Sequence, residues 1–137
     1  MSEAEKSVTE LVCSELSMEI SDLMGELSIA SNRVYVSSNE VVEYQSKFRQ
    51  AKLDLEVLEA TQDRRFREEA AELNIRMTEA SIAAAVALLP EVQASKAKLN
   101  ESLFLLDKAK AVHEALSERL RCVHEAIGML RTEIRNS

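Results

Sequence analysis

Histidine and cysteine are the side chains of this sequence best suited to catalysis or metal binding, and each occurs twice. His113 and His124 lie in the same short phrase, Val-His-Glu-Ala, eleven residues apart. Eleven residues are about three helical turns, which places both rings on one helix face but about 16 Å apart, too far to share a metal ion. The HExxH motif is absent, because the fourth residue after each histidine is Ser117 or Gly128. We therefore interpret both histidines as surface or interface residues of a helix.

The remaining chemistry-bearing residues form no recognisable catalytic set. Cys13 and Cys122 lack CxxC spacing and lie in helical patterns, which predicts reduced thiols in the core. Only Gly25 and Gly128 are available for a phosphate-binding loop, so none is expected. The carboxylates stand at helical spacing from basic groups, as on a solvated face. The sequence thus predicts a protein that is not an enzyme and has no catalytic residue, metal or cofactor.

Basic residues between positions 47 and 67 are the best candidates for a binding surface. On an ideal helix Arg49 and Arg67 share one azimuth, and Lys52 and Arg64 lie about 60° to either side. A stripe of this kind can follow a phosphate backbone by neutralising its charge. Lys47 and Arg65 coincide on another face. The predicted nucleic-acid-binding residues are Arg67, Arg64, Arg65, Arg49, Lys52 and Lys47.

The same residues also fit a solvated helix face without any ligand. Lys52 with Glu56, and Asp63 with Arg67, are spaced i,i+4. Such pairs stabilise an exposed helix by a few tenths of a kcal/mol. Base stacking has little support, since Phe and Tyr together number five and Trp is absent.

The net charge of −7 is almost entirely a property of the N-terminal segment. Residues 1–32 carry seven acidic groups and one lysine, a net charge of −6. Residues 33–76 have eight basic and nine acidic groups, and residues 77–137 have eight of each. The acidic start is unlike a signal peptide, and the longest uncharged run, Ala80–Pro90, is about half a membrane span. A cytoplasmic protein without membrane contact is expected.

The elements that carry these residues are predicted to be long helices. Two glycines and one proline in 137 residues exclude a turn-rich fold. We predict a helix near residues 8–20, breaks at Ser21-Asp22 and within Ser37–Asn39, and a long helix over 22–76. Thr78 opens an alanine-rich segment, and Pro90 marks either a kink or the start of a last helix over 91–135.

Apolar residues stepping by three and four indicate helix pairing along this all-α chain. The first series is Val41, Tyr44, Phe48, Ala51, Leu55 and Leu58, and after a jump of eight it continues with Phe66, Ala70, Leu73 and Met77. The jump acts as a local stutter. The last helix repeats the spacing at Leu99, Leu103 and Leu106, and we predict an oligomer interface at Leu116, Leu120, Val123, Ile127, Leu130 and Ile134.

The predicted architecture is a single all-α domain, a long helical hairpin that assembles into a helical oligomer. It comprises an acidic N-terminal helix (1–21), a long helix with the basic stripe (22–76) and a segment kinked at Pro90 (78–136). A helix over 22–75 would be about 80 Å long. That is too long for one small core, so contacts with other subunits are expected.

Two groups of phrases resemble the UvsY recombination mediators of tailed bacteriophages. The first group is Ala30–Val34, Leu58–Ala60 and Phe66–Ala70, and the second is Met77–Ile82, Leu89–Val92 and Leu130–Ile134. The resemblance covers roughly residues 22–135.

The resemblance implies an all-helical protein that forms hexameric or heptameric rings and binds single-stranded DNA. Proteins of this family loosen single-strand-binding protein from DNA and help load a RecA-like recombinase, so both would be partners, in the host cytoplasm. Arg67, beside Phe66, matches one basic position of the family's DNA-binding segment. Glu69 stands at the other and departs from the pattern, while Arg64 and Arg65 lie within a turn and could compensate. The alternative is a coiled-coil scaffold or assembly adaptor without nucleic-acid binding, of which a secretion-type chaperone is a variant.

Overall fold

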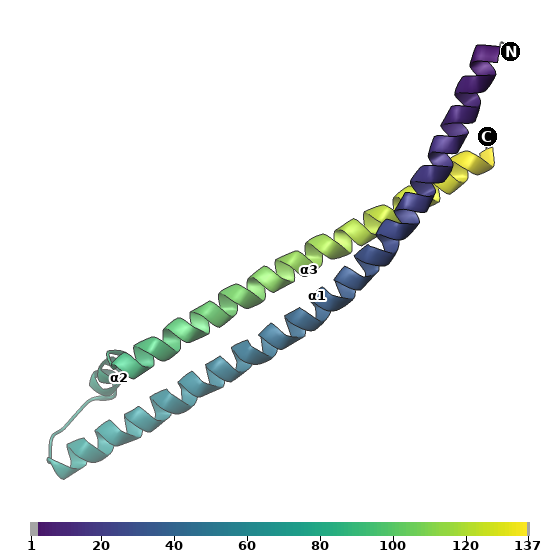
Figure 1. The fold of residues 1–137 in the computed structure, drawn as a ribbon. Helices are drawn as coiled ribbons and strands as arrows, with labels where there is room; N and C mark the ends of the chain where they lie inside the picture. The colour runs from purple at the N-terminus through teal and green to yellow at the C-terminus, as the bar shows by residue number, and fades with distance from the viewer. Residues whose placement is uncertain (1–2, 137) are drawn as a thin grey trace. The chain divides into compact units, whose positions relative to one another are not determined.

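The chain folds into three helices over the residues that the structure describes. A computed structural model describes the backbone of residues 3–136 and the side chains of residues 21–136. Helix α1 comprises Glu3–Glu72, α2 comprises Glu79–Ala87 and α3 comprises Pro90–Asn136 (Figure 1). No strand occurs within residues 3–136. The all-α prediction is therefore confirmed.

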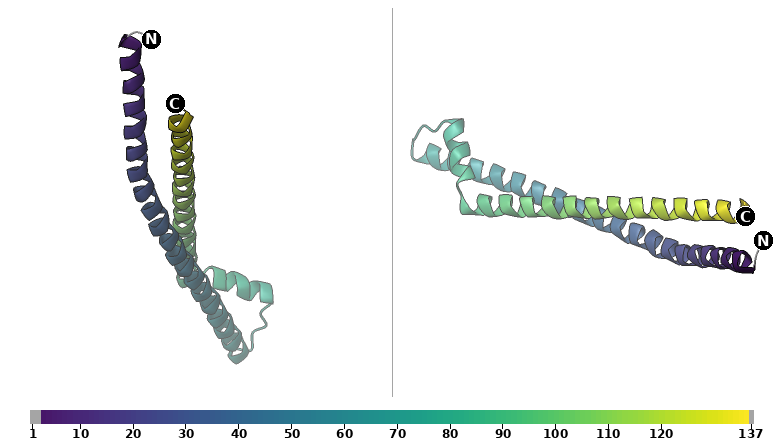
Figure 2. Two further views of the ribbon diagram at one scale, coloured as in Figure 1. Left: turned by 90° about the vertical axis from the view of Figure 1, so that its right-hand side faces the viewer. Right: turned by 90° about the horizontal axis from the view of Figure 1, so that it is seen from above.

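The structure divides into two units, each of which contains part of α1 and part of α3. Unit 1 combines Met1–Asn39 with Ala111–Ser137, and unit 2 is Glu40–Lys110. Within each unit the α1 and α3 segments run side by side in opposite directions (Figure 2). An antiparallel helix pair, as the predicted helical hairpin requires, is thus present in each unit, and the connection between the two helices lies in unit 2.

Helix α1 continues through both positions at which breaks were predicted. Residues 21–22 and 37–39 are helical, so the prediction of a separate N-terminal helix is wrong. A serine fits a helix interior when its hydroxyl binds a carbonyl of the preceding turn, and Ser37 Oγ donates to Val34 O at 2.9 Å. The side chain of Cys13 lies outside the described residues.

The buried face of α1 in unit 2 follows the predicted spacing, with one polar residue added. Gln62 is buried inside the predicted jump of eight residues. From the half-buried Leu58 the inward-facing positions then step by four to Gln62, Phe66 and Ala70, which is the stutter. Leu73 was expected in this series, but it is exposed because α1 ends at Glu72.

Helix α1 ends in a Schellman motif that is centred on Asn74. Asn74 has a φ of 56°, in the left-handed region that asparagine tolerates better than most residues. Ile75 N donates to Ala70 O at 2.9 Å, and Asn74 N donates to Ala71 O at 3.2 Å. These two bonds satisfy carbonyls that the helix end would otherwise leave unpaired.

Helices α2 and α3 are separate, so Pro90 begins a helix and does not kink one. The Thr78 side chain caps α2 by accepting from Ser81 N at 3.1 Å, and the predicted start of the alanine-rich segment at Thr78 is confirmed. Leu88 caps the other end of α2. Pro90 occupies the first position of α3, where its missing amide costs nothing.

All three helices contribute to the core of unit 2. Its buried members are Leu55 from α1, Ile82 and Val86 from α2, and Val92 from α3. The partly buried side chains packed around them are Leu58, Phe66, Met77, Leu89 and Leu99. The short α2 therefore covers apolar surface that two helices alone would leave open.

The α3 helix uses the predicted 3-4 spacing, but its register differs from the prediction at residue 103. Leu103 is exposed, and its place in the series is taken by Ser102, which is half-buried. The series then continues through Leu106, Ala109 and His113. The prediction considered only large apolar residues, so it omitted the small Ala109 and the polar Ser102 and His113.

The predicted oligomer-interface residues already pack within the chain to differing degrees. Val123 and Ile127 are buried in unit 1 by the chain itself, so these two side chains have an intramolecular role. Ile134 is exposed, while Leu116, Leu120 and Leu130 are half-buried. The core position predicted for Cys122 is wrong: it is exposed, with its thiol 3.9 Å from Glu118 Oε1. No helix in the described part of the chain could span a membrane.

Candidate nucleic-acid interface

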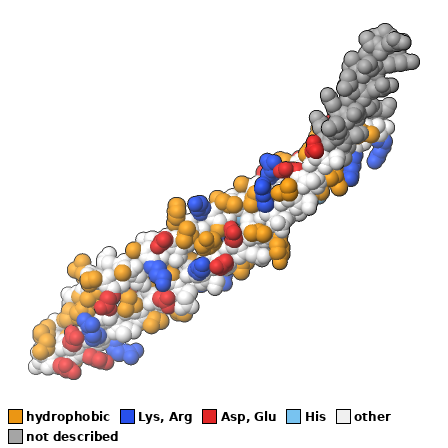
Figure 3. All heavy atoms as spheres, in the orientation of Figure 1, with side chains coloured by type: hydrophobic (Ala, Val, Ile, Leu, Met, Phe, Trp, Pro, Cys, Tyr) orange, Lys and Arg blue, Asp and Glu red, His pale blue; other side chains and the backbone are white. Residues whose placement is uncertain are grey.

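All six predicted basic residues lie on α1 within unit 2. All six side chains are exposed. The face of the molecule visible in Figure 3 carries basic and acidic side chains interspersed with exposed apolar ones. What separates the six residues is therefore their ion pairing.

Three of the six are neutralised by carboxylates of their own unit. Lys47 Nζ lies 3.2 Å from Glu43, and Arg65 Nε lies 3.4 Å from Glu69. Arg67 contacts two carboxylates, donating to Asp63 at 3.0 Å and lying 3.8 Å from Glu79 on α2. Glu69, the departure from the family pattern, thus holds the neighbouring Arg65.

Two of these neutralised groups also lie over aromatic rings. Lys47 Nζ is 5.4 Å from the centre of the Tyr44 ring, and the Arg65 guanidinium is 5.5 Å from the centre of the Phe66 ring. Cation–π contacts of this kind hold a side chain against its helix. Both cations are accordingly oriented by the protein as well as neutralised by it.

The other three basic side chains have no charged partner. Within residues 21–136, no ion pair or side-chain hydrogen bond involves Arg49, Lys52 or Arg64. The predicted pair of Lys52 with Glu56 does not form, whereas that of Arg67 with Asp63 does. These three unpaired cations span about four turns of α1. They are the positive charges of this helix most available to a phosphate backbone.

Exposed apolar side chains lie among the unpaired cations, and sequence reasoning missed them. Leu53 and Val57 are each more than half exposed. Together with Arg49, Ala60 and Arg64 they step by four, four, three and four, so they share one side of α1. Counting 3-4 steps on every face of the helix, and not only on the most apolar one, would have found this second series.

The aromatic residues of unit 2 contribute one exposed ring. Tyr44, Phe48 and Phe66 are half-buried on the predicted seam, and Phe104 on α3 is two-thirds exposed. Base stacking by aromatic side chains is worth about 1–3 kcal/mol per base. Phe104 is therefore the aromatic side chain of unit 2 best placed to stack on a base.

The two histidines have different environments despite their identical flanking phrases. His113 Nδ1 lies 2.8 Å from Ser37 Oγ, where α1 and α3 pair in unit 1, and His124 is exposed. The 3.5-residue repeat of paired helices rotates these positions further apart than an ideal straight helix does. Among the described residues, no three His, Cys, Asp or Glu side chains cluster as a metal site would require.

Comparison of the chain with protein-family models, with curated proteins and with solved structures finds no match. The candidate interface is therefore characterised by its own geometry: three unpaired cations and three ion-paired ones on a single helix.

Proposed function

We propose that the protein binds single-stranded DNA as an oligomer and acts as a recombination mediator. In this role it displaces single-strand-binding protein and helps load a RecA-like recombinase. The observation that supports the proposal best is the exposed, unpaired state of Arg49, Lys52 and Arg64 on one helix. The resemblance of residues 22–135 to UvsY mediators supplies the recombination context.

Three cations per chain suit the weak and reversible binding that a mediator requires. Each phosphate contact with a single strand releases about 0.7 counterion, so the affinity of one chain is low and salt-sensitive. Copies of the stripe in an oligomer act together by multivalency, which raises the overall affinity without any new contact. A strand held in this way is released when a stronger binder competes for it.

Fluorescence anisotropy with labelled oligo-dT tests the proposal through two matched triple variants. In the first variant glutamine replaces the unpaired residues, Arg49, Lys52 and Arg64. In the second it replaces the paired residues, Lys47, Arg65 and Arg67. Both variants lose three positive charges, and both keep side chains that favour helix.

We expect the first variant to bind at least tenfold more weakly than the wild type at low salt, and the second to lose no more than about threefold, because its cations are already neutralised. Equal losses would contradict the assignment of the interface to the unpaired residues. Failure of micromolar wild-type protein to bind at low salt would contradict the proposal itself.

A coiled-coil scaffold is the second candidate, because α1 has exposed apolar residues that could pair with another helix. These residues lie on the same side of α1 as two of the unpaired cations. Leu53 and Val57 could pair with another helix at 3-4 spacing. A second helix on this side would cover Arg49 and Arg64, so the two candidates compete for one surface. If serine at both 53 and 57 dissociates the oligomer, the scaffold is favoured; if native mass and DNA binding persist, the mediator is.

A further inference from the structure

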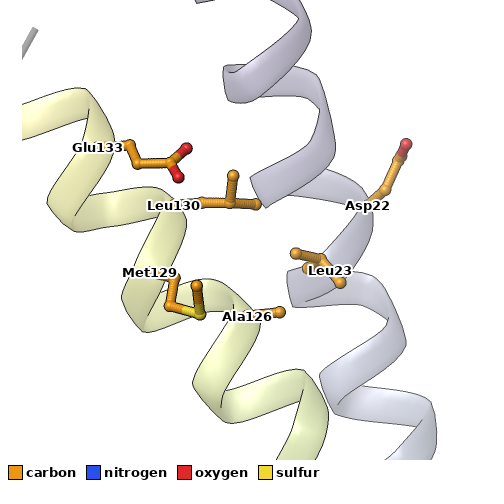
Figure 4. A pocket seen from close by; sticks show the side chains of 6 residues that line it. All are labelled: Asp22, Leu23, Ala126, Met129, Leu130 and Glu133. Carbon is orange, nitrogen blue, oxygen red and sulfur yellow. The ribbon is translucent and has the colours of Figure 1, made fainter.

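Unit 1 contains an apolar groove where α1 and α3 pair, well separated in sequence from the basic stripe. The groove has a volume of about 500 Å³ and is lined by Asp22, Leu23, Ala126, Met129, Leu130 and Glu133. Figure 4 shows Leu23 and Leu130 extending toward each other from the two helices, with Ala126 beside them on α3. The groove therefore has walls from both helices.

The α3 wall of the groove includes one small residue, Ala126, and one flexible residue, Met129. Ala126 leaves space that a larger side chain would fill, and Met129 remains about two-thirds exposed. Exposed methionine is costly to leave in water, but it adapts its shape to a bound surface. This combination is typical of a surface that accepts an apolar side chain of another molecule.

The lining chemistry favours a protein segment over a small molecule. A small-molecule site encloses its ligand and fixes it with several convergent polar groups. Here the charged groups of the lining are the carboxylates of Asp22 and Glu133, and the remaining four residues are apolar. An amphipathic helix that inserts one large apolar side chain matches this arrangement.

Charge determines which kind of segment fits. Among the described residues of the lining, both ionisable ones are acidic, and Asp22 is exposed at the edge of the groove. Arg131, which follows Leu130, is not among the described lining residues, and its guanidinium donates weakly to Met24 Sδ at 3.7 Å. Complementarity therefore calls for a basic partner.

We propose that this groove docks a basic amphipathic helix of a partner protein, which inserts one large apolar side chain between Leu23 and Met129 and places Lys or Arg beside Asp22. The groove lies in unit 1 and the unpaired cations lie in unit 2, so the docking is distinct from DNA binding. Peptide binding and single-strand binding are measured separately, so failure of one proposal does not decide the other.

The test measures binding of a labelled synthetic helical peptide to the full chain. The probe is a 14-residue peptide of leucine and lysine with leucines on one face, and its matched control carries glutamate in place of each lysine. We expect the lysine peptide to bind with a Kd in the micromolar range and the glutamate peptide to bind at least tenfold more weakly. Met129→Lys should weaken binding of the lysine peptide at least fivefold, and Asp22→Asn about twofold with a reduced salt dependence.

Two control substitutions separate groove binding from general attraction to an acidic protein. Phe104→Lys also replaces an exposed apolar residue by lysine, and Glu114→Gln also removes one exposed carboxylate of unit 1. Both should leave peptide affinity unchanged, as should the glutamine variants of the unpaired cations. Equal weakening by Met129→Lys and Phe104→Lys would overturn the proposal, and so would conversion of an oligomer to a monomer by Met129→Lys, because the groove would then hold a second copy.

Discussion

The two units pair the same two helices by different means. Unit 2 buries a continuous apolar cluster, which α2 completes with Ile82 and Val86. Unit 1 has no third helix among its described residues, and its helices are joined by polar contacts as well, Ser37 with His113 and Glu26 with Arg119. The difference teaches that a third helix enlarges the apolar core of unit 2, whereas unit 1 combines the buried Ala30, Val123 and Ile127 with individual hydrogen bonds between its two helices.

The largest effect is expected from truncation in the apolar core of unit 2. Leu55→Ala should destabilise the protein by about 2–5 kcal/mol, since it removes a buried side chain and leaves a cavity. Leu53→Ala, two residues away and exposed, should cost less than about 1 kcal/mol. Urea unfolding followed by circular dichroism measures both, and comparable losses would mean that Leu53 is also buried, in an oligomer.

Loss of the hydrogen bond between Ser37 and His113 should lower the unfolding free energy measurably, although only one hydroxyl group is removed. Ser37 Oγ donates to Val34 O, so His113 Nδ1 must be the donor in the contact between the two side chains. Ser37→Ala should cost about 1–2 kcal/mol because that ring nitrogen loses its partner in a half-buried site. Ser38→Ala, which is exposed, has the same change in helix propensity and serves as the control. Equal unfolding free energies for the two variants would contradict a stabilising role for this pair.

A polar residue of unit 2 should behave in the opposite way. Gln62 donates weakly to Glu91 at 3.4 Å, and its Oε1 is buried without a hydrogen-bond partner. Gln62→Leu should stabilise the protein by about 1 kcal/mol, because it removes an unsatisfied buried group and Glu91 remains accessible to water. The matched Gln45→Leu change, at a half-buried position, should lie within about 0.5 kcal/mol of the wild type. A destabilised Gln62→Leu variant would show that the amide has a partner.

The smallest effect concerns the pH dependence of an exposed ion pair in unit 1. The hydrogen bond from Arg121 and its positive charge lower the pKa of the Glu118 carboxyl below its ordinary value of 4.5. A lowered pKa in the folded state stabilises the protein above that value, and this contribution is lost as the pH falls through the folded-state pKa. The small stability difference between wild type and Glu118→Gln at pH 7 should decrease steadily as the pH falls below 4.5. A difference that stays constant as the pH falls would assign it to packing.

The sequence predicts the helical class, the start of the alanine-rich segment at Thr78 and most of the buried series, because 3-4 spacing and helix starts are local properties. The continuity of α1 was not predictable from the sequence, because Ser37, Ser38 and Asn39 are residue types that favour helix starts. The contact of Ser37 with His113, which shows that Ser37 lies inside a paired helix, is visible only in the structure. The burial of Gln62 was not predicted for a similar reason. A polar residue is not expected at a buried position of a helix pair, and its burial is known only from the packing around it. The six basic residues of the candidate site were found, but their division into paired and unpaired cations depends on rotamers and on Glu79 of another helix.

Single-strand binding measured as a function of salt tests the central claim most directly, namely that Arg49, Lys52 and Arg64 contact the phosphates. Each lost contact should reduce the slope of log affinity against log salt by about 0.7. The variant with glutamine at these three positions should therefore show a slope lower by about 2 for each chain that engages the strand, while the variant at Lys47, Arg65 and Arg67 keeps nearly the wild-type slope. A slope that is unchanged by the first variant, or reduced equally by both, would contradict the account.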